Sequence, residues 1–151
     1  MVNVTLTPPE VLFALGVATQ RDACKADRAH RMSRKTTGFG VHFIGAVGEI
    51  AARKVYGGKL NLDVLPDGDK HAPDLVLADG RRVEVKASTF TGMGVTMKFQ
   101  KDELGKSEHY CLVQVSLPDT VTVHPVLAWA DIKDKLQIAQ YGHGDCLVYS
   151  L

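Results

Sequence analysis

The chain has 151 residues and a formal net charge of +1, with 45% hydrophobic and 23% charged residues. This is the size of one ordinary domain, and the nearly neutral charge gives no sign of a polyanionic partner by itself. No apolar run reaches the roughly 20 residues of a membrane-spanning helix, and the first twenty residues lack the basic start of a signal peptide. Three widely spaced cysteines (Cys24, Cys111 and Cys146) form no CxxC pair, which favours free thiols in a reducing cytoplasm. We expect a cytoplasmic protein without an organic cofactor.

Two helices are predicted in the first third of the chain. The run Thr7-Pro8-Pro9-Glu10 is typical of a helix start, and this N-terminal helix is expected from about 9 to 34. Residues 36–40 are predicted to form a loop. A second, amphipathic helix is expected from about Phe43 to Tyr56, and Gly57-Gly58 after it suits a left-handed helix end.

From Leu60 onward the hydrophobic period changes to two, which predicts strands. The expected elements are strands from Leu60, at 74–77 and at 81–87, a short strand at 95–99, a helical turn near 101–108, strands at 111–117 and 121–126, a helix at 129–141 and a last strand at 146–150. The aromatic residues Phe99, Tyr110 and Trp129 are expected in the core. The whole pattern predicts one α/β domain over residues 1–151.

Basic residues are concentrated just before the second helix. They recur at spacings of three and four, which places most of them along one helical face: Arg21, Lys25, Arg28, Arg31, Arg34 and Lys35. Two interpretations stay open, a stripe that contacts nucleic-acid phosphates and a solvated helix face. Lys98 and Gln100 are further candidates for contact with DNA, and an exposed strand or turn explains them equally well.

The most informative segment is the hairpin expected between Pro73 and Lys86. A two-residue turn at Asp79-Gly80 would place Asp74 opposite Val85, and its carboxylate would point away from Glu84. A three-residue loop, Ala78-Asp79-Gly80 with Gly80 left-handed, places Asp74 opposite Glu84 instead. Lys86 then lies on the same face, and the apolar residues of both strands share the other face. Because this register gathers the charged residues on one face and the apolar residues on the other, we predict the three-residue loop.

This arrangement is suited to a divalent cation. Mg²⁺ prefers a few carboxylate oxygens and keeps several waters, and Mn²⁺ would substitute for it. Asp74 and Glu84 would each supply an oxygen, and the Val85 carbonyl a third. The cation would polarise a phosphate and activate a bound water, while Lys86 would orient that water or stabilise developing charge.

Other interpretations of the same residues stay open. An acid-x-lysine triplet occurs by chance in an average chain, and Asp131-Ile132-Lys133 is a second example. Glu84 and Lys86 could be an ordinary same-face pair on an exposed hairpin. Asp69 could replace Asp74, and Glu49 on the second helix could be a plain surface acid.

The sequence Pro73-Asp74 followed by Glu84-Val85-Lys86 resembles the signature of the PD-(D/E)xK nuclease superfamily, which includes restriction endonucleases and Holliday-junction resolvases. The second helix, with Gly48-Glu49-Ile50, resembles the first core helix of that superfamily. The resemblance implies a restriction-endonuclease-like α-β-β-β-α-β core over about 43–117, with a mixed central sheet flanked by helices. It also implies that Asp74, Glu84 and Glu49 bind metal and that Lys86 assists hydrolysis.

Three functions therefore remain in view. The leading hypothesis is a Mg²⁺-dependent deoxyribonuclease, an endonuclease rather than an exonuclease, of phage or mobile-element type and possible as a homodimer. The second is a nucleic-acid-binding or assembly module on the same fold that no longer cuts. The third is an unrelated α/β protein in which the hairpin acids are structural. No membrane association is expected.

Overall fold

The computed structural model describes residues 1–25, 38–61, 72–90, 94–100, 104–117, 119–141 and 144–151. Its elements are, in chain order, β1 (Val2–Thr5), α1 (Pro8–Lys25), α2 (Gly38–Tyr56), β2 (Lys59–Leu60), β3 (Leu75–Val76), β4 (Arg82–Ser88), β5 (Thr96–Phe99), β6 (His109–Leu117), β7 (Thr120–Val123), β8 (Leu127–Ala128), α3 (Trp129–Ile132), the 3₁₀ turn Lys133–Lys135, β9 (Gln137–Tyr141) and β10 (Gly144–Ser150). The protein is of the mixed α/β class, as expected. None of the described helices is long and apolar enough to cross a membrane.

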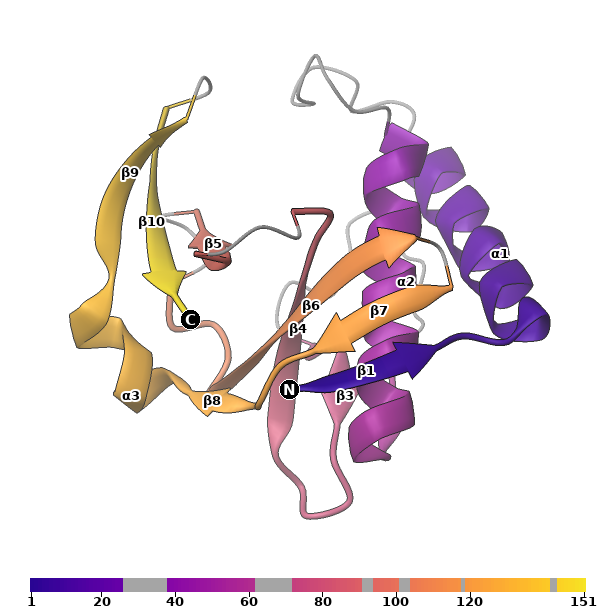
Figure 1. The fold of residues 1–151 in the computed structure, drawn as a ribbon, viewed down its shortest axis with the longest axis horizontal. Coiled ribbons are helices and arrows are strands. Elements are labelled where there is room, and N and C mark those ends of the chain that lie inside the picture. Colours follow the sequence, from indigo (N-terminus) through magenta and orange to yellow (C-terminus); the bar gives the residue numbers. More distant parts are fainter. Residues whose placement is uncertain (26–37, 62–71, 91–93, 101–103, 118, 142–143) are drawn as a thin grey trace.

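The strands form two sheets. The larger sheet has the order β1-β7-β6-β4-β3-β2, and β8 pairs with β6 beside this path. Within it β4 and β6 are parallel, while the other pairs are antiparallel. The smaller sheet has the order β5-β10-β9 and is antiparallel. Helices α1 and α2 lie on one side of the larger sheet, and β9 and β10 lie on the opposite side of the molecule (Figure 1).

The main core lies between α2 and the larger sheet. Gly48 allows a close approach there, because a Cβ at this position would lie 2.9 Å from the Ala87 Cβ on β4 and 3.6 Å from the Val113 Cβ on β6. The buried side chains of this core include those of the hairpin strands: Leu75, Leu77, Val83 and Val85.

A second core lies beside β5 and β6. It contains Met97, Phe99, Tyr110 and Leu112, with Trp129 packed against it. The Phe99 ring centroid lies 5.1 Å from that of Tyr110 and 5.8 Å from that of Trp129, in edge-on contacts that favour aromatic packing. The prediction that these three aromatic residues belong to the core is confirmed.

The hairpin register is the one predicted. Leu75 pairs with Val83 and Val76 with Arg82, so the same register places Asp74 opposite Glu84. The Leu77 N–H donates to the Arg81 carbonyl at 2.9 Å, which leaves a three-residue loop between them. Gly80 closes this loop with a φ of +85°, a conformation that glycine adopts without steric cost.

The predicted start of the first long helix is confirmed, whereas the second begins earlier than predicted. Helix α1 runs from Pro8 to Lys25, and the rest of the predicted 9–34 helix lies outside the described residues. Helix α2 begins at Gly38, so the predicted loop at 36–40 is wrong for 38–40. The added turn carries Phe39, whose ring stacks on that of Phe43 one turn later, with centroids 6.3 Å apart. Such a pair, four residues apart, stabilises a helix. The predicted end is confirmed, because Gly57 has a φ of +72° and its N–H donates to the Arg53 carbonyl.

The C-terminal region contains the largest error of the sequence analysis. The predicted helix 129–141 ends at Ile132, continues as the 3₁₀ turn, and is replaced by β9 from Gln137. Strand β9 pairs with β10 over five residues, and these backbone hydrogen bonds outweigh the weak helical pattern. The predicted last strand is confirmed, two residues longer at its start.

Smaller differences concern the strands. Strand β1 was not predicted, although it pairs with β7 over four residues. The strand predicted to reach Val126 ends at Val123. Residues 104–108 form a turn and bends instead of the predicted helical turn, whose first residues lie outside the described part of the chain.

The close contact at Gly48 predicts an unusual response to alanine. Gly48→Ala should destabilise the protein by about 1–2 kcal/mol despite the better helix propensity of alanine, because the new methyl group meets the rigid Ala87 side chain. Gly16→Ala in α1 is the matched control, because nothing lies within 4 Å of its added Cβ, and this variant should gain stability. Urea denaturation measures both, and equal changes in the two variants would contradict the packing described here.

Candidate functional site

Asp74, Glu84 and Lys86 are brought together at the open end of the β3–β4 hairpin. Because Leu77 and Arg81 form a hydrogen-bonded pair, alternation along the hairpin makes Asp74 and Glu84 a non-hydrogen-bonded pair. The side chains of such a pair lie close together. The Lys86 Nζ lies 3.5 Å from the Glu84 Oε1, and both side chains are partly buried. The structure therefore places two acids and one lysine on one face.

The backbone of β4 holds the Asp74 carboxylate. The Val85 N–H donates to the Asp74 Oδ2 at 2.8 Å, and the Asn61 N–H donates to the Asp74 carbonyl at 2.9 Å from the other side. The N–H and C=O of one residue point to the same edge of a strand. The Val85 carbonyl therefore faces the edge on which Asp74 lies, as its predicted role as a ligand requires.

Glu49 approaches this region from α2, and it is held by an arginine from α1. The Arg21 Nη1 lies 2.6 Å from the Glu49 Oε1, and the Nη2 lies 2.9 Å from the Oε2, in a two-pronged ion pair. The side chains of Arg21 and Glu49 are only 16% and 8% exposed. Two charges this far removed from water need such a geometry, because their desolvation is costly.

The electrostatics show that the three acids lie within reach of one another. Burial, and after it the negative charges of Glu84 and Glu49, raise the pKa of Asp74 to about 8. The Val85 N–H and the Lys86 charge oppose this shift. Burial also raises the pKa of Glu49, while the hydrogen bonds from Arg21 lower it and the Glu84 charge raises it. Mutual repulsion of this kind is typical of acids that converge on one point.

The donor set fits a hard divalent cation in its chemistry. Carboxylate and carbonyl oxygens are the ligands that Mg²⁺ and Mn²⁺ prefer. A cation would relieve the repulsion that, after burial, contributes to the raised pKa of Asp74. As the described side chains stand, however, no three Asp, Glu, His or Cys groups are arranged to hold a metal ion together. Arg21 occupies both Glu49 oxygens, so the carboxylates converge only in part.

The other predicted site residues are not part of this cluster. Lys98 is exposed on β5, on the face opposite the buried Met97 and Phe99, and the exposed Gln100 follows that strand. Lys98 therefore belongs to the smaller sheet, and Gln100 lies directly after it. The remaining DNA-contact candidates and the alternative ligand lie outside the described residues: Arg28, Arg31, Arg34, Lys35 and Asp69.

Arg21 is the residue whose role the sequence analysis missed. It was grouped with the basic stretch as a phosphate contact or a solvated residue, whereas the structure uses it as the partner of Glu49. A lone arginine 28 residues upstream of a glutamate carries no local signal of pairing. Only the antiparallel contact of α1 with α2, which also joins Lys54 to Glu10, brings the two together.

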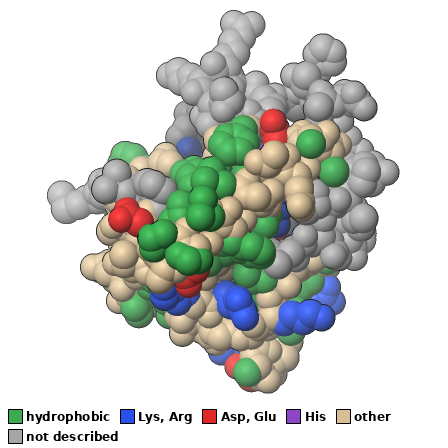
Figure 2. Space-filling model, turned by 90° about the vertical axis from the view of Figure 1, so that its right-hand side faces the viewer, with side chains coloured by type: hydrophobic (Ala, Val, Ile, Leu, Met, Phe, Trp, Pro, Cys, Tyr) green, Lys and Arg blue, Asp and Glu red, His purple; other side chains and the backbone are tan. Residues whose placement is uncertain are grey.

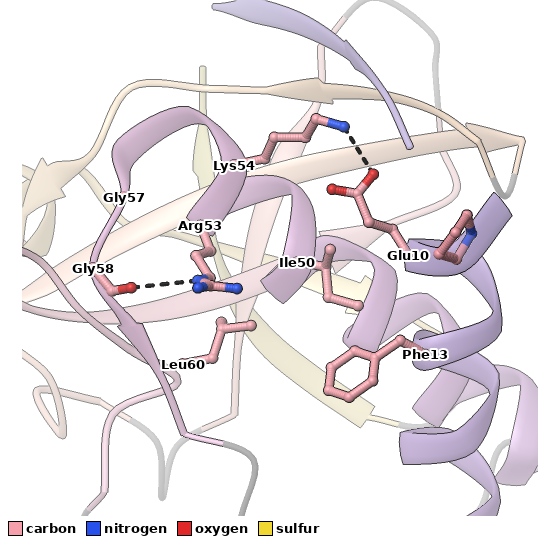
Figure 3. A pocket seen from close by; sticks show the side chains of 9 residues that line it. Glu10, Phe13, Ile50, Arg53, Lys54, Gly57, Gly58 and Leu60 are labelled. Atoms are coloured by element: carbon pink, nitrogen blue, oxygen red, sulfur yellow. Dashed lines mark hydrogen bonds and ion pairs between the residues drawn. The ribbon is translucent and has the colours of Figure 1, made fainter. Parts of the chain in front are cut away.

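A shallow groove of about 450 Å³ lies at the other end of the two helices. It is lined by Pro9, Glu10, Phe13, Ile50, Arg53, Lys54, Gly57, Gly58 and Leu60. Figure 3 shows that its charged groups are already engaged, Lys54 with Glu10 and Arg53 with the Gly58 carbonyl. None of the predicted catalytic residues lines it, so the carboxylate cluster is the better candidate site.

The side of the molecule that carries α1 is partly apolar. Figure 2 shows hydrophobic side chains gathered on this face. Leu12 and Phe13 of α1 are 67% and 48% exposed.

The raised pKa of Asp74 predicts a pH dependence of stability. Its folded pKa of about 8 lies above its ordinary value of 3.8. Its contribution to the free energy of unfolding is therefore fully present below about pH 4, where Asp74 is protonated in both states. This contribution is lost as the pH rises to about 8, because the folded protein must then hold an unfavourable negative charge. Asp74→Asn keeps an oxygen for the Val85 N–H and removes the charge. In EDTA at pH 8, this variant should be more stable than the wild type by on the order of 1–3 kcal/mol, with a smaller difference at pH 5.

Asp79→Asn in the hairpin loop is the control. Asp79 is exposed, and the backbone and side chain of Arg81 lower its pKa, so its loss should not stabilise the protein at pH 8. Denaturant titrations at a series of pH values measure both variants. A wild-type-like pH profile for Asp74→Asn would show that Asp74 is not in a repulsive environment.

Comparison with known proteins adds no family to this picture. No protein-family model matches the chain, and no curated protein sequence matches it. The case for a function therefore rests on the geometry and electrostatics of Glu49, Asp74, Glu84 and Lys86.

Proposed function

We propose that the protein is a metal-dependent nuclease that hydrolyses DNA phosphodiester bonds, with an endonuclease more favoured than an exonuclease. The observation that carries this proposal is the pairing of Asp74 with Glu84 in the hairpin register, with Lys86 beside Glu84 and with Glu49 near enough to raise the Asp74 pKa. Acids that repel one another beside a lysine are typical of a site that binds a cation and acts on an anion.

Each residue has a distinct role in this proposal. Asp74, Glu84 and the Val85 carbonyl hold Mg²⁺ or Mn²⁺, and Glu49 completes the site. When bound, the cation polarises the phosphodiester and lowers the pKa of a water molecule. Lys86, whose Nζ lies beside the Glu84 carboxylate, orients that water and stabilises the negative charge that develops on the phosphate.

The order of the elements also supports the proposal. Helix α2 is followed by the antiparallel strands β2, β3 and β4, and then by β6 parallel to β4. The PD-(D/E)xK resemblance implies this same order of one helix, then three strands, then a further strand. One expected element differs, because the described residues between β4 and β6 hold β5 instead of a helix.

The test is cleavage of plasmid, linear, branched and single-stranded DNA, and of RNA, with Mg²⁺ or Mn²⁺ and with EDTA as the metal-free control. Lys86→Ala and Asp74→Asn should each lower the cleavage rate by about 10²–10⁴-fold, because each removes a group that acts at the phosphate or at the metal. Lys133→Ala and Asp79→Asn are the matched controls. Lys133 belongs to the other acid-x-lysine triplet and is exposed, as is Asp79, so neither change should affect cleavage.

The outcomes separate the competing functions. Metal-dependent cleavage that both site variants abolish supports the nuclease. Binding of nucleic acid without cleavage under any condition supports the non-cutting module instead. If the wild type neither binds nor cleaves any substrate, the hairpin acids are structural.

A further inference from the structure

The ion pair between Arg21 and Glu49 sets a condition on any cation that uses Glu49. The arginine is not a peripheral surface contact, because its guanidinium reaches both oxygens of the carboxylate and both side chains are largely buried. A bidentate arginine occupies the two oxygens in parallel hydrogen bonds. A metal ion ligated by Glu49 needs at least one of the same oxygens.

The charge of Arg21 acts on more than one acid. The negative charge of Asp74 also stabilises the protonated form of Arg21 and contributes to raising its pKa, after the larger effects of Glu49. The guanidinium therefore lies within electrostatic reach of both Glu49 and Asp74. A fixed positive charge in this position repels an incoming divalent cation and at the same time neutralises the acids that would bind it.

We propose that Arg21 is an internal counter-ion that competes with the divalent cation for Glu49, and so sets the cation concentration at which the site fills. This inference rests on the metal site of the proposed function and adds a regulatory residue to it. Arg21 is a positioning residue in this account: it determines whether Glu49 is available, and it touches neither the water nor the leaving group.

The position of Arg21 on α1 gives this competition a structural consequence. Among the described residues, two ion pairs join α1 to α2, Arg21 with Glu49 near one end and Lys54 with Glu10 near the other. When a cation takes Glu49, only the first of these pairs is released. Filling the site therefore loosens the C-terminal end of α1, which leads into the basic stretch, and leaves its N-terminal end attached.

The experiment measures the thermal unfolding temperature against Mg²⁺ concentration at pH 8.5, without nucleic acid. In the absence of Mg²⁺, Arg21→Gln should unfold at a lower temperature than the wild type, because Glu49 loses its partner. With increasing Mg²⁺, the variant should recover, and its half-maximal stabilisation should occur at an about tenfold lower Mg²⁺ concentration than in the wild type.

Lys54→Gln is the matched control, because it removes the other ion pair between the same two helices. It should lower the unfolding temperature at every Mg²⁺ concentration and leave the half-maximal concentration unchanged. If Arg21→Gln does not fold, Arg21→Lys replaces it. Lysine keeps the positive charge but cannot form the bidentate pair with Glu49. The half-maximal Mg²⁺ concentration of this variant should therefore shift less, in the same direction.

An unchanged or higher half-maximal Mg²⁺ concentration in the folded Arg21 variant would overturn the competition, because Arg21 would then be neutral toward the cation or would help to bind it. A wild type whose unfolding temperature does not respond to Mg²⁺ at any concentration would overturn the metal site itself, and the proposed function with it. Direct calorimetric titration of Mg²⁺ into the same proteins measures the affinities without reference to cleavage.

Discussion

The register of the β3–β4 hairpin is the constraint on which the rest of the site depends. A shift of one residue would turn Asp74 to the opposite face from Glu84 and would expose the apolar side chains that pack under α2. The loop of Ala78, Asp79 and Gly80 prevents this shift, because Gly80 adopts a positive φ that other residues rarely adopt. The packing of the hydrophobic core and the pairing of the acids are therefore fixed by the same loop.

That register also concentrates charge at a partly buried place. When all are ionised, the acids Glu49, Asp74 and Glu84 carry three negative charges against the two positive charges of Arg21 and Lys86. Burial first, and then the charges of Glu84 and Glu49, raise the pKa of Asp74. The protein offsets this repulsion with backbone donation from Val85 and with the guanidinium of Arg21. A divalent cation is the ligand that would remove the remaining imbalance.

The sequence was sufficient for features that depend on local pattern. Two-residue alternation and a single glycine predicted the hairpin register, and the Gly57-Gly58 pair predicted the end of α2. Features set by distant parts of the chain were missed. Strand β9 forms because β10 is available to pair with it, and Arg21 meets Glu49 only because α1 packs against α2. The stacking of Phe39 on Phe43, which accompanies the earlier start of α2, was also not weighed against the loop-forming glycines.

We propose that Asp74, Glu84 and the Val85 carbonyl surround a divalent cation. A crystal structure of the protein grown with Mn²⁺ and measured at a wavelength where manganese scatters anomalously tests it most directly. We expect an anomalous peak between the Asp74 and Glu84 carboxylates, with the Arg21 guanidinium displaced from at least one Glu49 oxygen. A fully paired Arg21 and Glu49, with no peak at the hairpin, would contradict it.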